Sequence, residues 1–402
     1  MFKPKQSILT VVEICSSKVV CIIAKIEGKK SEILGIGYVK SDGVRSGIIS
    51  DIELAQSTVK NAVNDAEKVS GIKVGKVFLS LSSNYLLSQS LTTEIPTISK
   101  SITHRELNKL LMDAIQICKN RDLEVIHTFA CNYILDGQHG ISNPLGMFGN
   151  RLSCNFHILS VASNSILNLH TVLSKAGLEI NGYIAGIYSS GLSILSQAEI
   201  DNGIILIDFG SEVTSIGIFQ NEQLIYVDSI PIGGRHITSD IAKIFCIPKS
   251  EAERLKNIYG LAIKSDIDSN DVVEIKRDNE KTIIKHDELT AIIQARLEEI
   301  LHIVESKIKE FKINNVVITG GTARISLLKD LINTILNCKT RVGYPQNIDF
   351  SNNNSLELTS VLGVIKHVVD NMQETSNTGS NYNDQTNNKQ KLFTWLKRTF
   401  FS

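Results

Sequence analysis

Short apolar runs rich in β-branched side chains come in pairs near the start and near the middle of the chain. SILTVVEI at residues 7–14 and KVVCIIAKI at 18–26 predict two strands joined by the turn CSS. The segment GIILIDFGSEVTSIGIF at 203–219 repeats this order, and Glu13 aligns with Asp208. A carboxylate at a strand end costs free energy unless it faces solvent, a metal or a ligand. The two hairpins therefore predict a duplicated domain with an acid at each turn; chance similarity between two short hairpins is the alternative.

Two glycine pairs follow apolar strands in the second half of the chain. The strand at 315–319 leads into Gly320-Gly321 and then a helix, and Gly233-Gly234 precede a helix that Thr238 or Ser239 can cap. Glycine lets the backbone approach a ligand closely, and a helix N-terminus favours anions. The alternative is a purely steric role, because many α/β turns contain two glycines.

Helical periodicity follows the second glycine pair. SEAERLKNIYG at 250–260 predicts a helix with Glu253 and Lys256 one turn apart, for which an ordinary surface ion pair is the alternative. A polar, charged stretch occupies 264–287, and a long amphipathic helix is predicted over 288–311.

The region between the two hairpins, residues 83–162, has a different pattern. Three strand-like runs (LLSQSLTTEI, VIHTFACNYIL and RLSCNFHILSVAS) flank one helix, THRELNKLLMDAIQICK. Thr103 and Glu106 form a capping-box signature at the start of that helix. We interpret this region as a small α+β domain inserted in the first half.

Composition narrows the classes of protein. A chain of 402 residues predicts two to four domains. Lys plus Arg and Asp plus Glu both number 42, so we expect no nucleic-acid partner. The seven cysteines and nine histidines form no ligand-spaced cluster, which favours reduced thiols and no metal-binding motif of that type. Glu13 and Lys18 interrupt the first apolar run, which argues against a signal peptide, and no apolar span reaches about 20 residues.

The chain ends in KLFTWLKRTFFS, after the polar stretch NTGSNYNDQTNNK. At about 100° per residue the apolar side chains of this end except Phe401 fall on one arc, with Lys391, Thr394, Lys397 and Arg398 opposite. The pattern predicts an interfacial helix that binds anionic lipid, on a polar tether. The residues predicted to meet the membrane are Leu392, Phe393, Trp395, Leu396, Lys397, Arg398 and Phe400. Docking of the tail on its own domain or on a partner protein is the alternative.

The order of these motifs resembles the actin, hexokinase and Hsp70 superfamily, and over nearly the whole chain it resembles the FtsA family of bacterial cell-division proteins. The segments that carry the resemblance are VEICSSKVVCIIAKI, SDGVRSGIISDIELAQSTVKNAVNDAE, NPLGMFGNRLSCNFHILSVA, IPIGGRHITSDIA, the Ala-Glu-x-x-Lys-x-x-x-Gly helix, QARLEEIL, VVITGGTARI and the basic aromatic tail.

The resemblance implies an α/β fold of the actin-like ATPase type, with two duplicated halves around a nucleotide cleft, an inserted α+β domain and a C-terminal amphipathic helix. The implied parts are 1–82 and 163–199 (subdomain 1A), 83–162 (the insert, 1C), 200–230 (2A), 231–304 (2B), 305–371 (return to 2A and 1A), 372–388 (a disordered polar linker) and 389–402 (the membrane helix).

The resemblance also implies ATP with Mg²⁺ in the cleft, with Asp208 holding the metal through water. The residues implied to bind the cofactor are Glu13, Ser16, Ser17, Lys18, Asp208, Gly210, Ser211, Gly233, Gly234, Glu253, Lys256, Gly320 and Gly321.

Four residues depart from the glycine-rich turns of the family: Cys15 in the first turn, and Ser211, Glu212 and Val213 in the second. A side chain at 15 crowds the phosphates, and Glu212 brings a like charge unless it turns away. We expect weakened ATP binding and at most slow or vestigial ATP hydrolysis, so we do not expect an enzyme.

The implied function is to tether the FtsZ ring to the cytoplasmic face of the membrane at the division site and to scaffold the septal machinery. The implied partners are the C-terminal peptide of FtsZ, later division proteins, further copies of the chain and an anionic membrane surface. Arg296 and Glu299 match the FtsZ-binding surface, although a solvated helix face is the simpler interpretation.

Two other functions remain as alternatives. One is a related scaffold such as the cytoplasmic protein of type IV pilus assembly, against which the basic aromatic tail argues. The other is a sugar-kinase-like enzyme, which would need a catalytic base and intact phosphate-binding turns.

Overall fold

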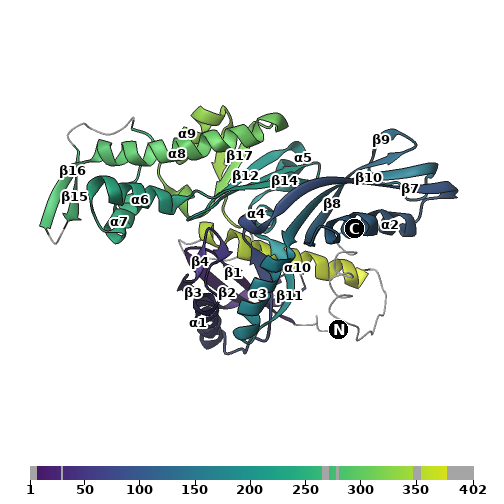
Figure 1. The fold of residues 1–402 in the computed structure, drawn as a ribbon, viewed down its shortest axis with the longest axis horizontal. Coiled ribbons are helices and arrows are strands. Elements are labelled where there is room, and N and C mark those ends of the chain that lie inside the picture. The colour runs from purple at the N-terminus through teal and green to yellow at the C-terminus, as the bar shows by residue number, and fades with distance from the viewer. Residues whose placement is uncertain (1–6, 29, 265–270, 278–279, 347–354, 378–402) are drawn as a thin grey trace.

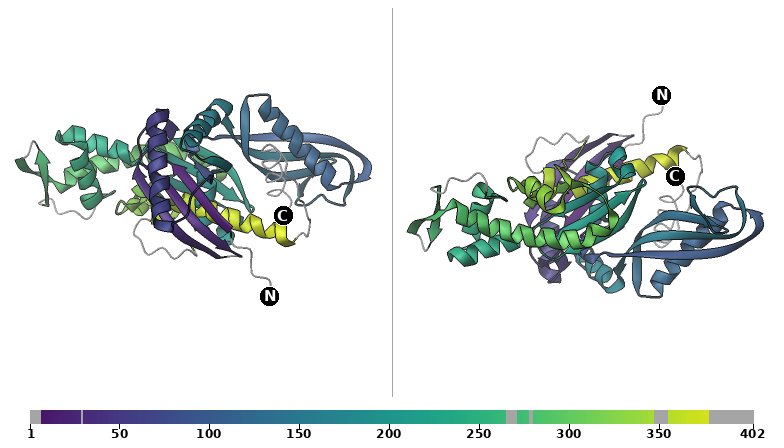
Figure 2. Two further views of the ribbon diagram at one scale, coloured as in Figure 1. Left: turned by 90° about the horizontal axis from the view of Figure 1, so that it is seen from below. Right: turned by 90° about the horizontal axis from the view of Figure 1, so that it is seen from above.

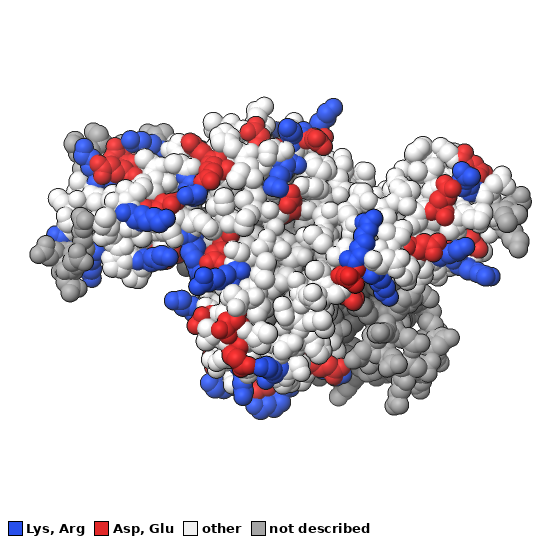
Figure 3. Space-filling view, in the orientation of Figure 1, with Lys and Arg blue, Asp and Glu red and all other residues white. Residues whose placement is uncertain are grey.

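The computed structural model describes residues 7–28, 30–264, 271–277, 280–346 and 355–377 (Figure 1). They form two lobes and an inserted domain. The membrane-binding tail predicted at 389–402 lies outside the described residues. Within the described part of the chain, no helix combines the length and the apolar character needed to cross a bilayer. On the face shown in Figure 3, the side chains of Lys and Arg lie interspersed with those of Asp and Glu.

The first lobe is built around a five-stranded sheet. Its elements are β1 (Ser7–Ile14), β2 (Lys18–Glu27), β3 (Lys30–Lys40), β4 (Val44–Arg45), β5 (Ile48–Ile49), α1 (Ile52–Ser70), β6 (Lys76–Leu81), η1 (Ser83–Tyr85), α3 (Ser163–Lys175), β11 (Glu179–Ala185), α4 (Gly186–Ile194) and α10 (Thr359–Asn377).

The second lobe contains another five-stranded sheet. Its elements are α5 (Gln197–Asn202), β12 (Ile204–Phe209), β13 (Thr214–Gln220), β14 (Gln223–Ile230), α6 (Gly234–Phe245), α7 (Lys249–Tyr259), β15 (Val272–Arg277), β16 (Glu280–Lys285), α8 (His286–Ile308), η2 (Lys309–Phe311), β17 (Asn315–Thr319), η3 (Gly321–Arg324), α9 (Leu328–Leu336), β18 (Lys339–Val342) and η4 (Ser355–Glu357).

The two sheets have the same topology, which confirms that the halves are duplicated. The strand order is β3-β2-β1-β6-β11 in the first lobe and β14-β13-β12-β17-β18 in the second. In each sheet an antiparallel hairpin is extended by a third antiparallel strand on one side and by two parallel strands on the other. The acid of each hairpin, Glu13 or Asp208, is therefore at the carboxyl end of a central strand.

Helices cover both faces of the first sheet, which explains why its hairpin reads as continuous apolar runs. Val12 and Ile14 point toward α1, and Leu9 and Val11 point toward α10. Figure 2 shows α1 and α10 on opposite sides of these strands.

The helices α4 and α10 form the layer between the lobes. α10 packs on the first sheet, and α4 packs on the second, where a Cβ atom at Gly191 would lie 2.3 Å from the Phe219 ring. The two helices meet at Gly363, where a Cβ atom would lie only 1.7 Å from the Ser189 carbonyl oxygen. Their backbones are therefore in direct contact, and only glycine fits at position 363.

The helix α10 was not anticipated from the sequence, and it corrects the start of the predicted linker. The linker was placed at 372–388, whereas the helix continues to Asn377. After Gly363 the next glycine or proline is Gly379, so no residue of the kind that stops a helix occurs before that position.

The inserted domain has the strand order β7-β10-β8-β9 with one helix against the sheet (Figure 1). Its elements are β7 (Leu87–Ser101), α2 (His104–Lys119), β8 (Leu123–Leu135), β9 (Gln138–Ile141) and β10 (Phe148–Ala162). The predicted capping box is present: Arg105 N donates to Thr103 Oγ1 over 3.2 Å, and Thr103 N donates to Glu106 Oε2 over 2.9 Å. The insert lies at the end of the molecule opposite to the hairpin of β15 and β16.

The sequence left one stretch of the second lobe without a predicted element, and one local expectation there was wrong. The polar stretch 264–287 contains the hairpin of β15 and β16, whose apolar residues alternate with charged ones, so that only Val273 and Ile275 of β15 are buried. Thr238 does not cap α6 but lies within it, because the helix begins at the glycine pair itself, where Gly234 N donates to Gly210 O over 3.0 Å.

Candidate functional site

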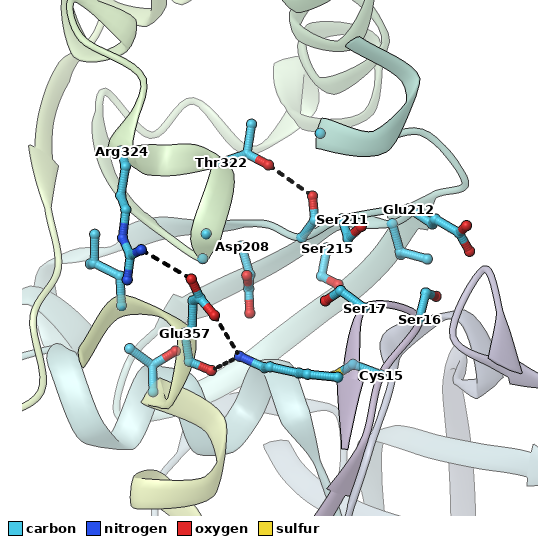
Figure 4. Close-up of a pocket in the computed structure, with 18 of the residues that line it drawn as sticks. Cys15, Ser16, Ser17, Asp208, Ser211, Glu212, Ser215, Thr322, Arg324 and Glu357 are labelled. Carbon is cyan, nitrogen blue, oxygen red and sulfur yellow. Dashed lines mark hydrogen bonds and ion pairs between the residues drawn. The ribbon is translucent and has the colours of Figure 1, made fainter. Parts of the chain in front are cut away.

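The two hairpin turns face each other across a cleft of about 510 Å³ between the lobes (Figure 4). We call residues 15–17 the first turn and residues 210–213 the second turn. Of the residues predicted to bind a cofactor, those that line the cleft are Glu13, Ser16, Ser17, Lys18, Asp208, Gly210, Ser211, Gly234, Glu253, Lys256, Gly320 and Gly321. Gly233 lies behind the second turn instead, where a Cβ atom would be 2.6 Å from Gly210 O.

Two carbonyl groups of the second turn, those of Gly210 and Ser211, point toward the start of α6. Gly210 O accepts hydrogen bonds from Gly234 N and from Thr322 Oγ1, each over 3.0 Å, and Ser211 O accepts one from Arg235 N over 2.7 Å. The N–H and C=O groups of a planar trans peptide point in opposite directions. The N–H groups of Ser211 and Glu212 are therefore directed away from α6, as in backbone concavities that bind anions.

Two carboxylates approach each other in the floor of the cleft. Burial and the neighbouring Glu13 charge raise the pKa of Asp208 to about 7, against the opposing effect of Lys18. Ser360 Oγ donates a hydrogen bond to Glu13. Among the described residues no group of three or more His, Cys, Asp or Glu side chains could hold a metal ion. This pair of oxygen donors suits Mg²⁺ only where water or ligand oxygens complete its coordination.

Cys15 of the first turn lines the same cleft. Burial is the main cause that raises the pKa of its thiol well above the ordinary value, and the Glu13 charge adds to it. The side chain is therefore a neutral thiol, which is a poor nucleophile and a poor metal ligand.

An ionic cluster at one end of the cleft joins the lobes through Glu357. Its carboxylate lies 3.6 Å from Lys18 Nζ and 3.1 Å from Arg324 Nη1, and it accepts a hydrogen bond from the Tyr38 hydroxyl over 2.7 Å (Figure 4). Lys18 also donates to the main-chain oxygen of Glu357. Sequence reasoning missed Glu357, Arg324 and Tyr38, because no local pattern connects Lys18 and Tyr38 of the first lobe with Arg324 and Glu357 near the other end of the chain.

A second ionic contact occupies the other end of the cleft, where Figure 4 places Ser16 and Glu212. Arg235 Nη1 lies 2.5 Å from Glu212 Oε1, and Arg235 Nη2 donates to Ser16 O over 3.1 Å. Ser46 N donates to Glu212 Oε2 over 2.5 Å. Burial acts to raise the pKa of Glu212, but Ser46 and Arg235 together hold it below its usual value. The carboxylate is therefore ionised and held by groups of both lobes.

Glu253 and Lys256 of α7 are more than an ordinary surface pair. Lys256 Nζ lies 2.7 Å from Glu253 Oε2 and also donates to Gly234 O and Thr238 Oγ1, over 3.1 and 2.9 Å. The lysine side chain is only 8% exposed, and burial lowers its pKa. The pair thus ties α7 to the glycine turn that begins α6.

Arg296 and Glu299 lie on α8, away from the cleft lining. Arg296 Nε pairs with Asp240 Oδ2 of α6 over 2.7 Å, and the same guanidinium pairs with Glu299. The contact fastens α8 to α6 and leaves Glu299 about half exposed, with 48% of its side chain accessible.

Comparison with known proteins places these features in a family. The chain matches the sequence model of "Cell division protein FtsA" over residues 205–363 and that of "SHS2 domain inserted in FTSA" over residues 83–160. The cell division protein FtsA of Agrobacterium fabrum is 31% identical over 366 residues, which cover 86% of this chain and 82% of that protein.

Solved structures share the fold at low sequence identity. One from a PilM-PilN type IV pilus biogenesis complex has a TM-score of 0.66 at 13% identity, covering 90% of this chain and 98% of that one. MreB5 of Spiroplasma citri bound to ADP has a TM-score of 0.54 at 14% identity, covering 91% and 98%. These likenesses confirm the actin-like fold that the motif order predicted.

Proposed function

The chain belongs to the FtsA family of cell-division proteins, and from this premise we propose that it tethers a polymer of FtsZ to the cytoplasmic face of the cell membrane. In this proposal it also scaffolds the septal division machinery and associates with further copies of itself. The observation that carries the proposal is the 31% identity to an FtsA protein over 82% of that protein's length, together with the family matches over residues 205–363 and 83–160.

The membrane contact is proposed from the sequence of the tail. The aromatic and aliphatic side chains of residues 392–400 would enter the interface, while Lys397 and Arg398 would meet anionic headgroups. A single short amphipathic helix binds reversibly, so the association would be peripheral.

We further propose that the cleft binds an adenine nucleotide with Mg²⁺. Its two turns, its buried carboxylate pair and the glycine turn at Gly320-Gly321 support this, and a structure of the same fold is one of MreB5 bound to ADP. Asp208 and Glu13 would hold the cation through water. Rapid hydrolysis is not expected, because Cys15 fills space in the first turn and Glu212 adds a negative charge in the second.

For the protein partners, the proposal assigns the FtsZ C-terminal peptide to the surface of residues 231–304 and later division proteins to the insert. Glu299 is the better candidate for a peptide contact, because Arg296 is already engaged by Asp240. No nucleic-acid partner is proposed, since the positive and negative charges of the chain are equal in number.

Co-sedimentation with liposomes tests the tether directly. The full chain is compared with a chain truncated after Asn388, on anionic and on neutral vesicles, with an FtsZ tail peptide present. We expect only the full chain to pellet with anionic vesicles and to bring the peptide down.

Two outcomes would contradict the proposal in different ways. Equal pelleting of the two chains would show that the tail is not the anchor. Pelleting of the full chain without the peptide would favour a second candidate function, that of a membrane-associated scaffold of another assembly. The fold shared with a protein of the PilM-PilN complex supports that candidate.

A further inference from the structure

Glu212 lies where the end of a bound polyphosphate would lie. Figure 4 places Arg324 and Glu357 at one end of the cleft, Asp208 and Thr322 near its middle, and Ser16 with Glu212 at the other end. A nucleotide whose adenosine meets the glycine turn next to Thr322 would extend its phosphates along the two turns toward Glu212. The last phosphate of the longest nucleotide would come closest to this carboxylate.

The donors at this end of the cleft are already engaged by Glu212. The Arg235 guanidinium and the Ser46 N–H, which could otherwise bind a phosphate, both contact its carboxylate at 2.5 Å. The Glu212 side chain is 12% exposed, so little water screens its charge. An internal anion thus occupies the position of a ligand's terminal anion.

The position of Glu212 is fixed from the first lobe as well. Ser46 and Gly47 form the turn between β4 and β5, with φ of 47° and 73°. Gly47 N donates to Ser16 Oγ over 2.6 Å, and a Cβ atom at Gly47 would lie 2.2 Å from Ser82 Oγ. Because this turn is packed against the first turn of the cleft, it cannot retreat to make room for a further phosphate beside Glu212.

We propose that Glu212 makes the cleft select a nucleoside diphosphate over a nucleoside triphosphate. This inference rests on the nucleotide binding proposed above. A diphosphate ends before the Glu212 contact and leaves it intact. A triphosphate must either displace the carboxylate from Arg235 and Ser46 or lie beside a like charge in a cleft with little water, and both lower its affinity.

The test is equilibrium binding of Mg-ADP and of Mg²⁺ with a non-hydrolysable ATP analogue to the full chain. We expect the analogue to bind at least tenfold more weakly than ADP, which corresponds to about 1.4 kcal/mol. Glu212→Gln keeps the size of the side chain without its charge, and Glu212→Gly also frees Arg235. Both should strengthen binding of the analogue about tenfold while ADP binding changes little. Glu222→Gln, at an exposed position of the same lobe, is the matched control.

The outcomes separate this inference from the proposal on which it rests. Equal affinity of the unmodified chain for both nucleotides, or an equal change for both in the Glu212 variants, overturns the selectivity while nucleotide binding stands. Absence of binding of either nucleotide at millimolar concentration overturns both. Thermal unfolding of each variant establishes that it is folded. If the Glu212→Gly variant does not fold, the Glu212→Gln variant provides the decisive comparison.

Discussion

Lys18 Nζ and Glu357 Oε2 lie 3.6 Å apart, although 339 positions separate the two residues in the chain. The contact places a carboxylate from the last part of the second lobe over the first strand pair of the first lobe. It therefore competes directly with any anion that enters this end of the cleft.

Substitution Glu357→Gln should strengthen nucleotide binding and weaken the protein. Removing the carboxylate takes a negative charge out of the cleft, so we expect the affinity for the anionic Mg-ADP to rise by roughly a factor of ten. The free energy of unfolding should fall by about 2 kcal/mol, because the Lys18 ammonium loses its carboxylate in a buried position. Titration calorimetry and urea denaturation measure the two effects, with the exposed Glu310→Gln as control. A loss of affinity in the Glu357 variant would contradict the competition.

The raised pKa of Asp208 predicts a dependence of stability on pH. The pKa is about 7 in the folded protein and near 3.8 when the chain is unfolded, so the folded state binds the extra proton. Its stabilising contribution is complete below pH 4 and is lost as the pH rises to 7. Compared with Asp208→Asn, the wild-type protein should lose up to about 1.4 kcal/mol of stability per pH unit between pH 5 and 7. A difference in the free energy of unfolding that stays constant between pH 5 and 7 would refute the raised pKa of Asp208. The variant Asp201→Asn is the surface control.

Two buried histidines predict that the stability of the protein falls, rather than rises, as the pH is lowered. His157 joins the insert to the second lobe, donating from Nδ1 to Leu224 O over 2.7 Å while its Nε2 accepts from Ser88 Oγ over 2.9 Å. Burial lowers the pKa of His157 and of His367 to about 4 from 6.5. Stability is therefore complete above pH 6.5 and falls toward pH 4 as the unfolded chain takes up protons, by about 3 kcal/mol for each histidine.

The variant His157→Gln isolates one of these contributions. Its free energy of unfolding should be lower than that of the wild type at pH 7, and the deficit should shrink as the pH falls to 5. Parallel stability curves for the two proteins over that range would show that His157 is not buried in its neutral form.

The contact between Gly363 and Ser189 predicts a large effect of one methyl group. Gly363→Ala would place a Cβ atom 1.7 Å from the Ser189 carbonyl oxygen, so the two helices must separate. We expect the free energy of unfolding to fall by about 3 kcal/mol. Gly75→Ala, where no atom lies within 4 Å of the added Cβ and the backbone is not left-handed, should change stability by less than about 0.5 kcal/mol. Similar stabilities of the two alanine variants would exclude the close contact.

The local sequence pattern was sufficient to predict those elements of the fold that depend on neighbouring residues. The paired hairpins, the capping box at Thr103 and the helix with Glu253 and Lys256 each depend on residues within one or two turns of chain. The same reasoning failed at Thr238, which was predicted to cap α6. The helix begins earlier, at the glycine turn, so Thr238 lies inside it.

The contacts that join the two lobes at the cleft could not be predicted from the sequence, for a physical reason. Glu357 pairs with Lys18, and Glu212 pairs with Ser46, across the two lobes, so each pair depends on how the lobes sit together and not on local sequence. The sequence showed that Glu212 was an unusual residue for the second turn, but its partners Arg235 and Ser46 carry no pattern of their own.

The backbone contact of α4 with α10 has a mechanical consequence. Since a glycine contact leaves no room between the two helix backbones, the sheets that they cover cannot move closer together there, and we expect motion between the lobes to be a rotation about this helix layer. The insert and the β15–β16 hairpin lie at opposite ends of the molecule (Figure 1), so a rotation too small to separate the cleft contacts moves these ends most. If the copies in the self-association proposed above join through these two ends, such displacements would add from one copy to the next. The curvature of the assembly would then depend on which charges are paired inside each cleft.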